Sequence, residues 1–516
     1  MTATPYGFAL MRRHWAPLLV CALFCCALAL YWRGIGPGDA ERYLDAALHW
    51  REGPWLGDSH WSLRHLFVLP MTASFLVFGV SETAAIIPNV VYAALTIVVT
   101  WHFARRALGE REAFIAASLV ATSAFFVARP VGLEVYGAEA FFAILAMWLF
   151  IVAEVSKARA RWLIAAGLVA GLATTVREPS IYLMGVFGLA ILARRRDVWR
   201  SLFFVGAGFA AVIAVELAVY AIAAGDPLYR YKTDLNHRAI GVDVTMTAEE
   251  ASLPSRLKRM AAYLISYPMT TPLLALAGVA IAYLARTKAL RAYPGLAALK
   301  IVAAAALFSA IIVPLAFNLS LPRYYPLLTY GCILVIAVAV AVLWSRGRPR
   351  AAIAAGLGVI AVNAAIADFI SYDEYAEARG LARIAAAFPE PVSADPQTAH
   401  RARYQLRLKG LSGAEASAKI INARAPEPGA LFLMSSQARR NNPAYDRRWC
   451  VIEALAPRRT GWTHALIRQT GLARLLGRQM EDIVAPPAPI LLIRMLERPA
   501  QQDPASGRAC LGEQPA

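Results

Sequence analysis

The sequence has 516 residues, of which 59% are hydrophobic and 17% are charged, and its formal net charge is +18. Apolar runs of about 20 residues recur from end to end, which is typical of a polytopic membrane protein and not of a soluble enzyme. The basic residues occur in short clusters between these runs. Such clusters determine orientation in a membrane, so the positive charge does not indicate a nucleic-acid partner.

The first apolar run extends from about Trp15 to Trp32 and follows Arg12 and Arg13. Ala27-Leu28-Ala29 resembles a signal-peptidase site, so a cleaved signal peptide is the alternative interpretation. Because the run is longer than the usual core of a signal peptide, we interpret it as an uncleaved anchor. With the two arginines inside, the amino terminus is cytoplasmic and the following loop lies outside.

The first outer loop, residues 33–65, concentrates polar and aromatic residues. It contains Asp39, Glu41, Asp45, His49, Trp50, Glu52, Trp55, Asp58, His60, Trp61, Arg64 and His65. From Asp39 to Trp50 the apolar residues recur at helical spacing, which predicts an amphipathic helix in the membrane interface. An aromatic belt is the alternative for any one residue, but the whole set is typical of a functional site.

The next segment, Leu66 to Val80, is short. At about 1.5 Å per residue it gives roughly 22 Å of helix, whereas the apolar core of a membrane is about 30 Å thick. We therefore predict a re-entrant or interfacial segment. Five basic clusters then lie inside, at 105–111, 157–161, 194–200, 286–291 and 346–350. This alternation predicts about eleven transmembrane helices, with the carboxyl terminus outside.

The composition changes after a last span near residues 351–370. From Ser371 onward, charged stretches of helical period alternate with apolar runs at 391–394, 430–434, 449–455 and 489–495. This alternation predicts a small extracytoplasmic α/β domain at 371–516, after a transmembrane domain at 1–370. Cys450 and Cys510 are the only cysteines predicted outside the membrane, and we expect a disulfide between them. No Cys and His spacing resembles a zinc site.

Charged residues near membrane depth are costly, so those of the predicted outer side are the candidates for function. They are Asp39, Glu41, Asp58, His60, Arg64, His65, Glu134, Glu139, Arg177, Glu178, His237 and Arg323, with Glu216 about two turns below the surface. Structural alternatives stay open. Arg177 and Glu178 could form an ion pair at a helix break, and Arg323 could be an interfacial arginine. Glu216 could bind a neighbouring helix.

Six loosely defined stretches occur within the first 345 residues, and their order along the chain is more specific than any one of them. They are GDAERYLDAALHW in the first outer loop, Leu76–Leu95, ARPVGLEVYGAEAFFAIL, GLVAGLATTVREPSIYL, AGDPLYRY and LPRYYPLL. In this order they resemble the GT-C superfamily of membrane glycosyltransferases that use polyprenyl-phosphate sugars. The likeness is greatest to relatives of the lipid A aminoarabinose transferases and the protein O-mannosyltransferases. The resemblance implies eleven to thirteen spans with an acidic first outer loop.

The resemblance also implies that a carboxylate of this loop acts on the acceptor, while outer cations hold the donor phosphate. The family's Asp-Glu-x-Arg-Tyr pattern appears as Asp39-Ala40-Glu41-Arg42-Tyr43, so Asp39 and Glu41 are the catalytic candidates, with Glu41 displaced by one residue. A Lys-Pro-Pro-Leu stretch common in the family is missing, and Arg64-His65 stands near its place. The candidates for binding the donor phosphate and the substrate are Arg64, His65, Arg177, Arg323, Tyr324, Glu139, His60 and Asp58. No residue is assigned to a metal, and the need for a divalent cation stays open.

The sequence thus predicts an all-α polytopic protein of the bacterial inner membrane with a small periplasmic α/β domain. The expected reaction moves one sugar from a polyprenyl-phosphate carrier to a glycan, lipid or protein hydroxyl. Cations would stabilise the leaving phosphate, and a carboxylate would take the hydroxyl proton. The alternative is a transporter or flippase of a lipid-linked glycan. Such proteins often contain internal repeats, which we do not find here. A membrane scaffold is a third alternative.

Overall fold

The computed structural model describes residues 6–32, 34–35, 39–54, 56–194, 197–242, 252–266, 269–317, 322–370, 375–441, 449–455, 461–476, 478–486 and 489–495. The chain forms two compact units. The first contains residues 1–32, 42–74 and 85–370, and the second contains residues 33–41, 75–84 and 371–516. The second unit therefore includes two short segments of the amino-terminal half in addition to the carboxyl-terminal region.

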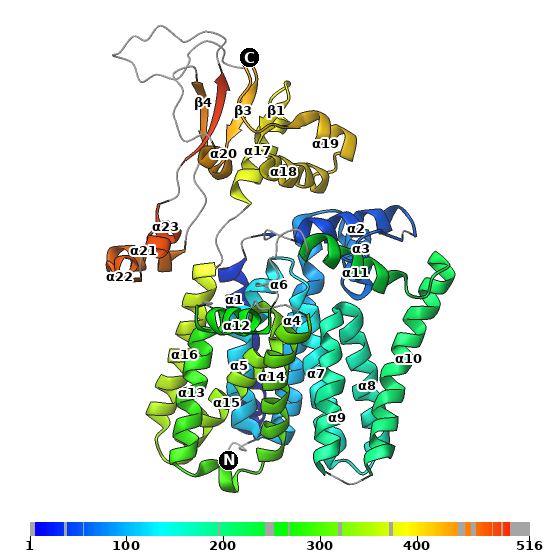
Figure 1. The fold of residues 1–516 in the computed structure, drawn as a ribbon. Helices are drawn as coiled ribbons and strands as arrows, with labels where there is room; N and C mark the ends of the chain where they lie inside the picture. Colours follow the sequence, from blue (N-terminus) through cyan, green and yellow to red (C-terminus); the bar gives the residue numbers. More distant parts are fainter. Residues whose placement is uncertain are drawn as a thin grey trace. The chain divides into compact units, whose positions relative to one another are not determined.

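The first unit is helical (Figure 1). Its long helices are α1 (Tyr6–Tyr31), α4 (Glu82–Ala107), α7 (Tyr136–Val155), α8 (Arg159–Val176), α10 (Val198–Ala224), α14 (Leu296–Phe317), α15 (Pro326–Ser345) and α16 (Pro349–Ile370). The shorter helices are α2 (Ala40–Glu52), α3 (His65–Phe78), α5 (Glu110–Thr122), η1 (Ala124–Ala128), α6 (Arg129–Val131), η2 (Glu178–Ile181), α9 (Tyr182–Arg194), α11 (Tyr229–Val242), α12 (Leu253–Ser266), α13 (Thr271–Arg286), η3 (Ala289–Ala292) and η4 (Pro322–Tyr324). The predicted amphipathic helix of the first outer loop is thus present as α2.

Within the described residues, six helices are long and apolar enough to cross a membrane. They are α4, α7, α10, α14, α15 and α16, and α5 with the segment 124–131 would make a seventh that bends by 54°. The protein is therefore a polytopic membrane protein, but the expected number of about eleven spans is not confirmed by helix length and composition. Helix α3 has only 14 residues, roughly 21 Å, so it is as short as the sequence predicts.

The interior of the first unit is built around α15. The apolar part of α15 is 78% buried, whereas the corresponding part of α10 is only 11% buried. Tyr330 of α15 accepts a hydrogen bond from Trp148 Nε1 at 2.8 Å and donates one to Thr100 Oγ1 at 3.1 Å, which satisfies its hydroxyl inside the core. Helix α15 is therefore a core element, and most of the apolar surface of α10 is exposed.

Helices α8 and α10 pack backbone to backbone. A Cβ at Gly167 would lie 2.0 Å from the carbonyl oxygen of Val205, and a Cβ at Gly208 would lie 2.2 Å from that of Ile164. Only glycine permits this distance, and such small-residue contacts are a common way for helices to associate in membranes. This close contact holds the interiors of α8 and α10 together.

The second unit contains a five-stranded sheet with the order β2-β1-β3-β5-β4. The strands are β1 (Val392–Ala394), β2 (Ile420–Asn422), β3 (Leu431–Met434), β4 (Trp449–Leu455) and β5 (Ile490–Met495). β1 pairs in parallel with β2 and β3, while β5 is antiparallel to both β3 and β4. The four apolar runs predicted from the sequence are all strands. A small carboxyl-terminal sheet is thus confirmed, and β2 is an additional strand that the sequence pattern did not indicate.

Helices accompany this sheet in the second unit. They are α17 (Ala376–Ala387), α18 (Pro396–Leu408), α19 (Gly413–Lys419), α20 (Ser436–Asn441), α21 (Trp462–Gln469), α22 (Leu472–Leu476) and α23 (Arg478–Val484). Asp395 caps α18 by accepting hydrogen bonds from the backbone amides of Gln397 and Thr398, each at 3.1 Å. Cys450 of β4 is disulfide-bonded. Its predicted partner, Cys510, lies outside the described residues.

Candidate functional site

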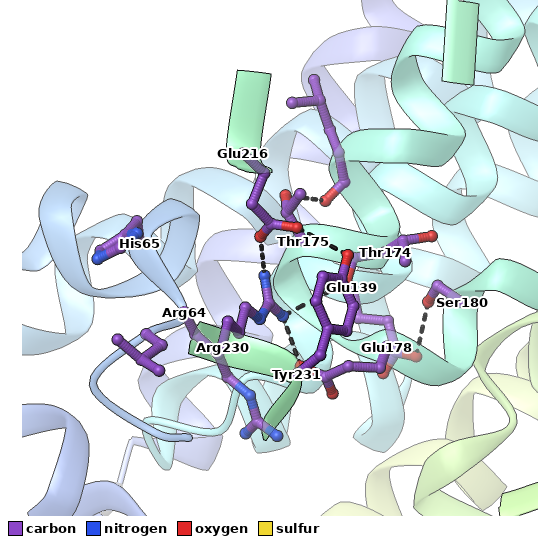
Figure 2. A network of polar contacts seen from close by, with 12 residues as sticks. Arg64, His65, Glu139, Thr174, Thr175, Glu178, Ser180, Glu216, Arg230 and Tyr231 are labelled. Atoms are coloured by element: carbon purple, nitrogen blue, oxygen red, sulfur yellow. Dashed lines mark hydrogen bonds and ion pairs between the residues drawn. The ribbon is translucent and has the colours of Figure 1, made fainter. Parts of the chain in front are cut away.

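A network of buried charges in the first unit is centred on Arg230 (Figure 2). The Arg230 side chain is 2% exposed and lies between Glu178 and Glu216. Its Nη2 is 2.5 Å from Glu178 Oε1, and its Nη1 binds Glu216. Tyr231 donates a hydrogen bond to the other oxygen of Glu216 at 2.9 Å. Two carboxylates from different elements thus hold one guanidinium out of water.

The chain reaches this arrangement through two local breaks. Helix α10 ends at Ala224 and is followed by Gly225, whose φ of 68° is accessible to glycine. The chain then turns back, so that Arg230 of α11 reaches Glu216 of α10. Helix α8 ends at Val176, because the next residue, Arg177, is in an extended conformation with φ −150° and ψ 126°. Glu178 then begins the short helix η2, which places its carboxylate against Arg230.

A second buried pair joins Arg177 to Glu139 of α7. Arg177 Nη1 is 2.7 Å from Glu139 Oε2, and Ser180 donates a hydrogen bond to Glu139 Oε1 at 3.0 Å. The side chains of Glu139 and Arg177 are 0% and 6% exposed. Arg177 and Glu178 do not pair with each other, although they are adjacent, because each binds a residue far away in the sequence. Removing one partner of such a pair would leave an uncompensated buried charge.

Arg323 lies in an aromatic setting beside this pair. Its guanidinium is 5.2 Å from the ring centre of Tyr324 and 5.6 Å from that of Tyr136. Arg177 lies over the same two rings, at 4.8 Å and 4.9 Å. Two guanidinium groups thus share one pair of tyrosines, which is favourable for each cation separately but concentrates positive charge. Arg323 also donates a hydrogen bond to the Tyr324 hydroxyl at 3.2 Å.

Arg323, which is half-buried, differs in its partners from three buried arginines of the first unit. Arg129 binds Glu134, Arg177 binds Glu139, and Arg230 binds two glutamates. Among the residues that the structure describes, no carboxylate lies within ion-pair distance of Arg323, although the charge of Glu134 acts on its guanidinium, and its buried Nε has no hydrogen-bond acceptor. The positive charge of Arg323 is therefore less neutralised than that of Arg129, Arg177 or Arg230.

Arg64 and His65 lie near Arg230 and Glu178. Burial opposes the ionisation of Glu178, but the charges of Arg230 and Arg64 outweigh it and hold the Glu178 pKa well below its usual value. Burial, together with the charge of Arg230, lowers the pKa of His65 to about 4. His65 is thus neutral at physiological pH, and its ring lies edge-on to Trp50 and 5.9 Å from the ring of Tyr220.

The remaining sequence candidates are distributed over both units. His60 is buried and its ring lies 3.8 Å from that of Trp61, while Asp58 is exposed in the same turn. Asp39 is exposed at the turn before α2, and it forms no hydrogen bond or ion pair with any residue in the described part of the chain. Glu41 follows it and is bound inside the second unit.

Glu41 is the centre of a separate cluster. Tyr375 donates a hydrogen bond to Glu41 Oε1 at 2.7 Å, Arg401 Nε is 3.2 Å from the same oxygen, and His400 Nε2 is 3.0 Å from Oε2. Burial raises the Glu41 pKa, but the hydrogen bonds and charges of these partners lower it more, so the net shift is downward. Both oxygens of Glu41 are therefore already engaged.

Six of the residues predicted to bind the donor or the substrate lie in two groups of the first unit. Arg64 and His65 lie near Glu178 and Arg230, whereas Glu139, Arg177, Arg323 and Tyr324 are linked to one another by contacts of Arg177 and Tyr324. Arg230, Tyr136 and Tyr220 also lie among these residues but were not predicted from the sequence. Arg230 lies in the stretch AGDPLYRY, which carried the resemblance, so this stretch was the available signal. Within the described residues, no three His, Cys, Asp or Glu side chains are grouped so as to hold a metal ion.

Known proteins share this arrangement of helices. The sequence profile of the family described as dolichyl-phosphate-mannose-protein mannosyltransferase matches residues 66–220, a range that contains Glu139, Arg177, Glu178 and Glu216. The oligosaccharyltransferase of Archaeoglobus fulgidus, solved in complex with Zn and sulfate, aligns with a TM-score of 0.50 at 12% identity, over 84% of this chain and 72% of that chain. The resemblance to the GT-C glycosyltransferases is confirmed.

Two further solved structures carry lipid ligands. The archaeal oligosaccharyltransferase AglB from Archaeoglobus fulgidus, in complex with an inhibitory peptide and a dolichol-phosphate, aligns with a TM-score of 0.50 at 13% identity, over 81% of this chain and 66% of that one. ArnT from Cupriavidus metallidurans, bound to undecaprenyl phosphate, aligns with a TM-score of 0.48 at 15% identity, over 87% of this chain and 97% of that chain. This chain spans about two thirds of the length of the archaeal proteins. Among curated proteins, none matches the sequence.

Proposed function

We propose that this protein is a glycosyltransferase that moves a sugar from a polyprenyl-phosphate carrier to a hydroxyl of a glycan, lipid or protein. The proposal places the reaction at the outer face of a bacterial inner membrane, with the amino terminus in the cytoplasm and residues 371–516 in the periplasm. The observation that carries it is the half-buried guanidinium of Arg323, which has no ion-pair partner among the described residues and whose buried Nε has no hydrogen-bond acceptor there. A planar guanidinium with free donors binds phosphate through two parallel hydrogen bonds.

The buried arginine network supports a leaving-group role for the donor phosphate. As the bond between the anomeric carbon and the phosphate oxygen breaks, negative charge increases on the phosphate. Arg323 is the cation that stabilises this charge, while Tyr136 and Tyr324 fix the orientation of its guanidinium. Arg177 is neutralised by Glu139, so its proposed role is to hold the shared tyrosines and thereby position Arg323.

The acceptor requires a base, and we assign this role to Asp39. The acceptor oxygen forms the new bond to the anomeric carbon, and its proton passes to the carboxylate. Asp39 is exposed and unengaged within the described residues, whereas both oxygens of Glu41 are bound by Tyr375, Arg401 and His400. Glu41 then serves to hold the start of α2 rather than to take a proton.

The test combines lipid binding with turnover. The purified protein would be analysed by native mass spectrometry with a polyprenyl-phosphate sugar, and sugar release would be followed with the same donor. We expect Arg323→Lys and Arg323→Ala both to weaken donor binding, because lysine keeps the charge but loses the paired donors. Arg105→Ala is the matched control, since it removes an exposed arginine at the end of α4.

The outcomes separate the proposal from its rival. Donor binding that is unchanged in both Arg323 variants would exclude Arg323 from the phosphate site. A flippase would instead move the intact lipid-linked sugar across a proteoliposome membrane without releasing polyprenyl phosphate. Movement of that kind without sugar release would overturn the glycosyltransferase assignment.

A further inference from the structure

A basic pocket lies where α8 and α10 begin, at the ends of these helices away from the Arg177 and Arg230 network. Its volume is about 420 Å³. The side chains that line it include Lys157, Arg159, Arg161, Asp197, Arg200 and Phe204. Four of these are cations and one is an acid, so the pocket carries a formal charge of about +3.

Most of this charge is not neutralised by the protein. Arg159 lies 3.3 Å from Glu154, but that carboxylate is also bound by Arg194. The Nε of Arg159 is buried and has no acceptor among the described residues. Arg161 and Arg200 lie over the rings of Trp162 and Phe204, and neither forms an ion pair with an acid in the part of the chain that the structure describes. An anion in this pocket would thus meet cations with free donors.

The backbone at the start of α8 and of α10 also favours an anion in the pocket. Helices α8 and α10 begin beside the pocket with 18 and 27 residues, and neither has a side-chain hydrogen bond at its N-cap. The amide groups of a first turn carry partial positive charge and favour an anion. The first turns of both helices line the pocket, and about two to three turns further along the helices are in backbone contact at Gly167 and Gly208.

The surface next to the pocket is apolar and exposed. Val155 and Trp199 are 85% and 84% exposed, and Phe203 is 68% exposed one turn after Trp199. Helix α10 is also the least buried of the six candidate spans. A tryptophan beside basic residues at the end of a span is typical of the level of the lipid headgroups. A headgroup in the pocket would therefore have room for its acyl chains along α10.

We propose that this pocket binds the phosphate headgroup of an anionic membrane lipid, whose acyl chains lie along α10. Clusters of cations between membrane helices are suited to anionic headgroups, and the exposed apolar surface favours a lipid over a soluble phosphate. This lipid is distinct from the sugar donor, because Arg323 belongs to a different group of residues. Binding would hold the first turns of α8 and α10 together at the membrane surface.

The experiment is native mass spectrometry of the full-length protein titrated with dioleoyl phosphatidylglycerol in detergent, with dioleoyl phosphatidylcholine as the neutral comparison. Arg161→Gln and Arg200→Gln remove two exposed cations of the pocket without burying a new group. We expect each to weaken phosphatidylglycerol binding roughly 5-fold, and the double variant roughly 25-fold, as for loss of a cation near an anionic surface. Arg286→Gln with Arg291→Gln is the control, because it removes two exposed arginines outside the pocket.

Each result decides the proposal. Weaker phosphatidylglycerol binding in the Arg161→Gln, Arg200→Gln double variant, with normal binding in the Arg286→Gln, Arg291→Gln control, supports a lipid site. Equal loss in both double variants, or equal binding of phosphatidylcholine, overturns it. Displacement of phosphatidylglycerol by 10-fold excess inorganic phosphate would identify a site for a soluble anion only, and would also overturn the lipid assignment. Circular dichroism of each variant checks that the helices are retained.

Discussion

Replacement of Arg230 by methionine tests whether the buried network stabilises the fold. Methionine fills a similar volume but leaves Glu178 and Glu216 without their common cation. These carboxylates are 12% and 10% exposed, so water compensates little of the lost pairing. Two like charges about 5 Å apart at an effective dielectric constant near 20 repel by about 3 kcal/mol. Removing one partner of a buried ion pair typically costs about 3–5 kcal/mol. We therefore expect Arg230→Met to lower the free energy of unfolding by about this amount.

The assay is the free energy of unfolding in lipid bicelles, measured by steric trapping. Lys232→Met is the matched control, because Lys232 is a cation of the same helix whose side chain is 60% exposed. It pairs with Asp226 at the surface, and such pairs contribute little, so we expect no measurable change. Glu178→Gln and Glu216→Gln, added to Arg230→Met, should restore most of the lost stability, because the two amides are neutral.

Equal stability of the Arg230→Met and Lys232→Met proteins would refute this reasoning. It would mean that water or a relaxed backbone compensates the two carboxylates in the absence of Arg230. Failure of the Gln substitutions to restore stability would instead indicate that packing of the Arg230 side chain, rather than charge, is what the fold requires.

Three further predictions concern the outer loop and the topology. Asp39→Asn should lower sugar transfer roughly 100-fold at normal protein level, the usual effect of removing a general base, whereas Glu41→Gln should mainly reduce stability. Normal transfer in Asp39→Asn would exclude Asp39 as the base. Because the folded-state pKa of Glu41 is depressed, its stabilising effect is present above the ordinary carboxyl pKa of 4.5 and is lost as pH falls through the folded value. Hydrogen-exchange protection at the start of α2, corrected for the intrinsic pH dependence of exchange, should thus be constant above pH 4.5 and decrease as the pH is lowered below 4.5 in the wild type, but not in Glu41→Gln. A cysteine at Ser81 should react with an impermeant thiol reagent in whole cells and one at Arg106 should not, and the reverse result would contradict the predicted orientation.

The sequence alone determined the class of the protein and the location of most elements. Apolar runs of helical length predict membrane helices, and the short apolar runs after Ser371 predict strands, because both patterns are local properties of the chain. β2 was not predicted because it has only three residues, Ile420–Asn422, and two of them are exposed. Its strand conformation results from pairing with β1, which a local pattern does not contain.

Only the tertiary structure decided which charges are paired. In the sequence, Arg177 and Glu178 look like partners because they are adjacent. In the fold, Arg177 is in an extended conformation, so neighbouring side chains point to opposite sides. Arg177 therefore binds Glu139, 38 residues away, and Glu178 binds Arg230, 52 residues away.

Contacts with distant residues also distinguish the two acidic candidates of the outer loop. Asp39 and Glu41 are equivalent in the sequence motif, yet Glu41 is bound by Tyr375, His400 and Arg401, more than 300 residues later. Asp39 has no such partner among the described residues. Composition and spacing can specify that charges gather on one side of a membrane. Which charge is neutralised and which is free depends on contacts between distant segments, since an ion pair is set by distance in space and not along the chain.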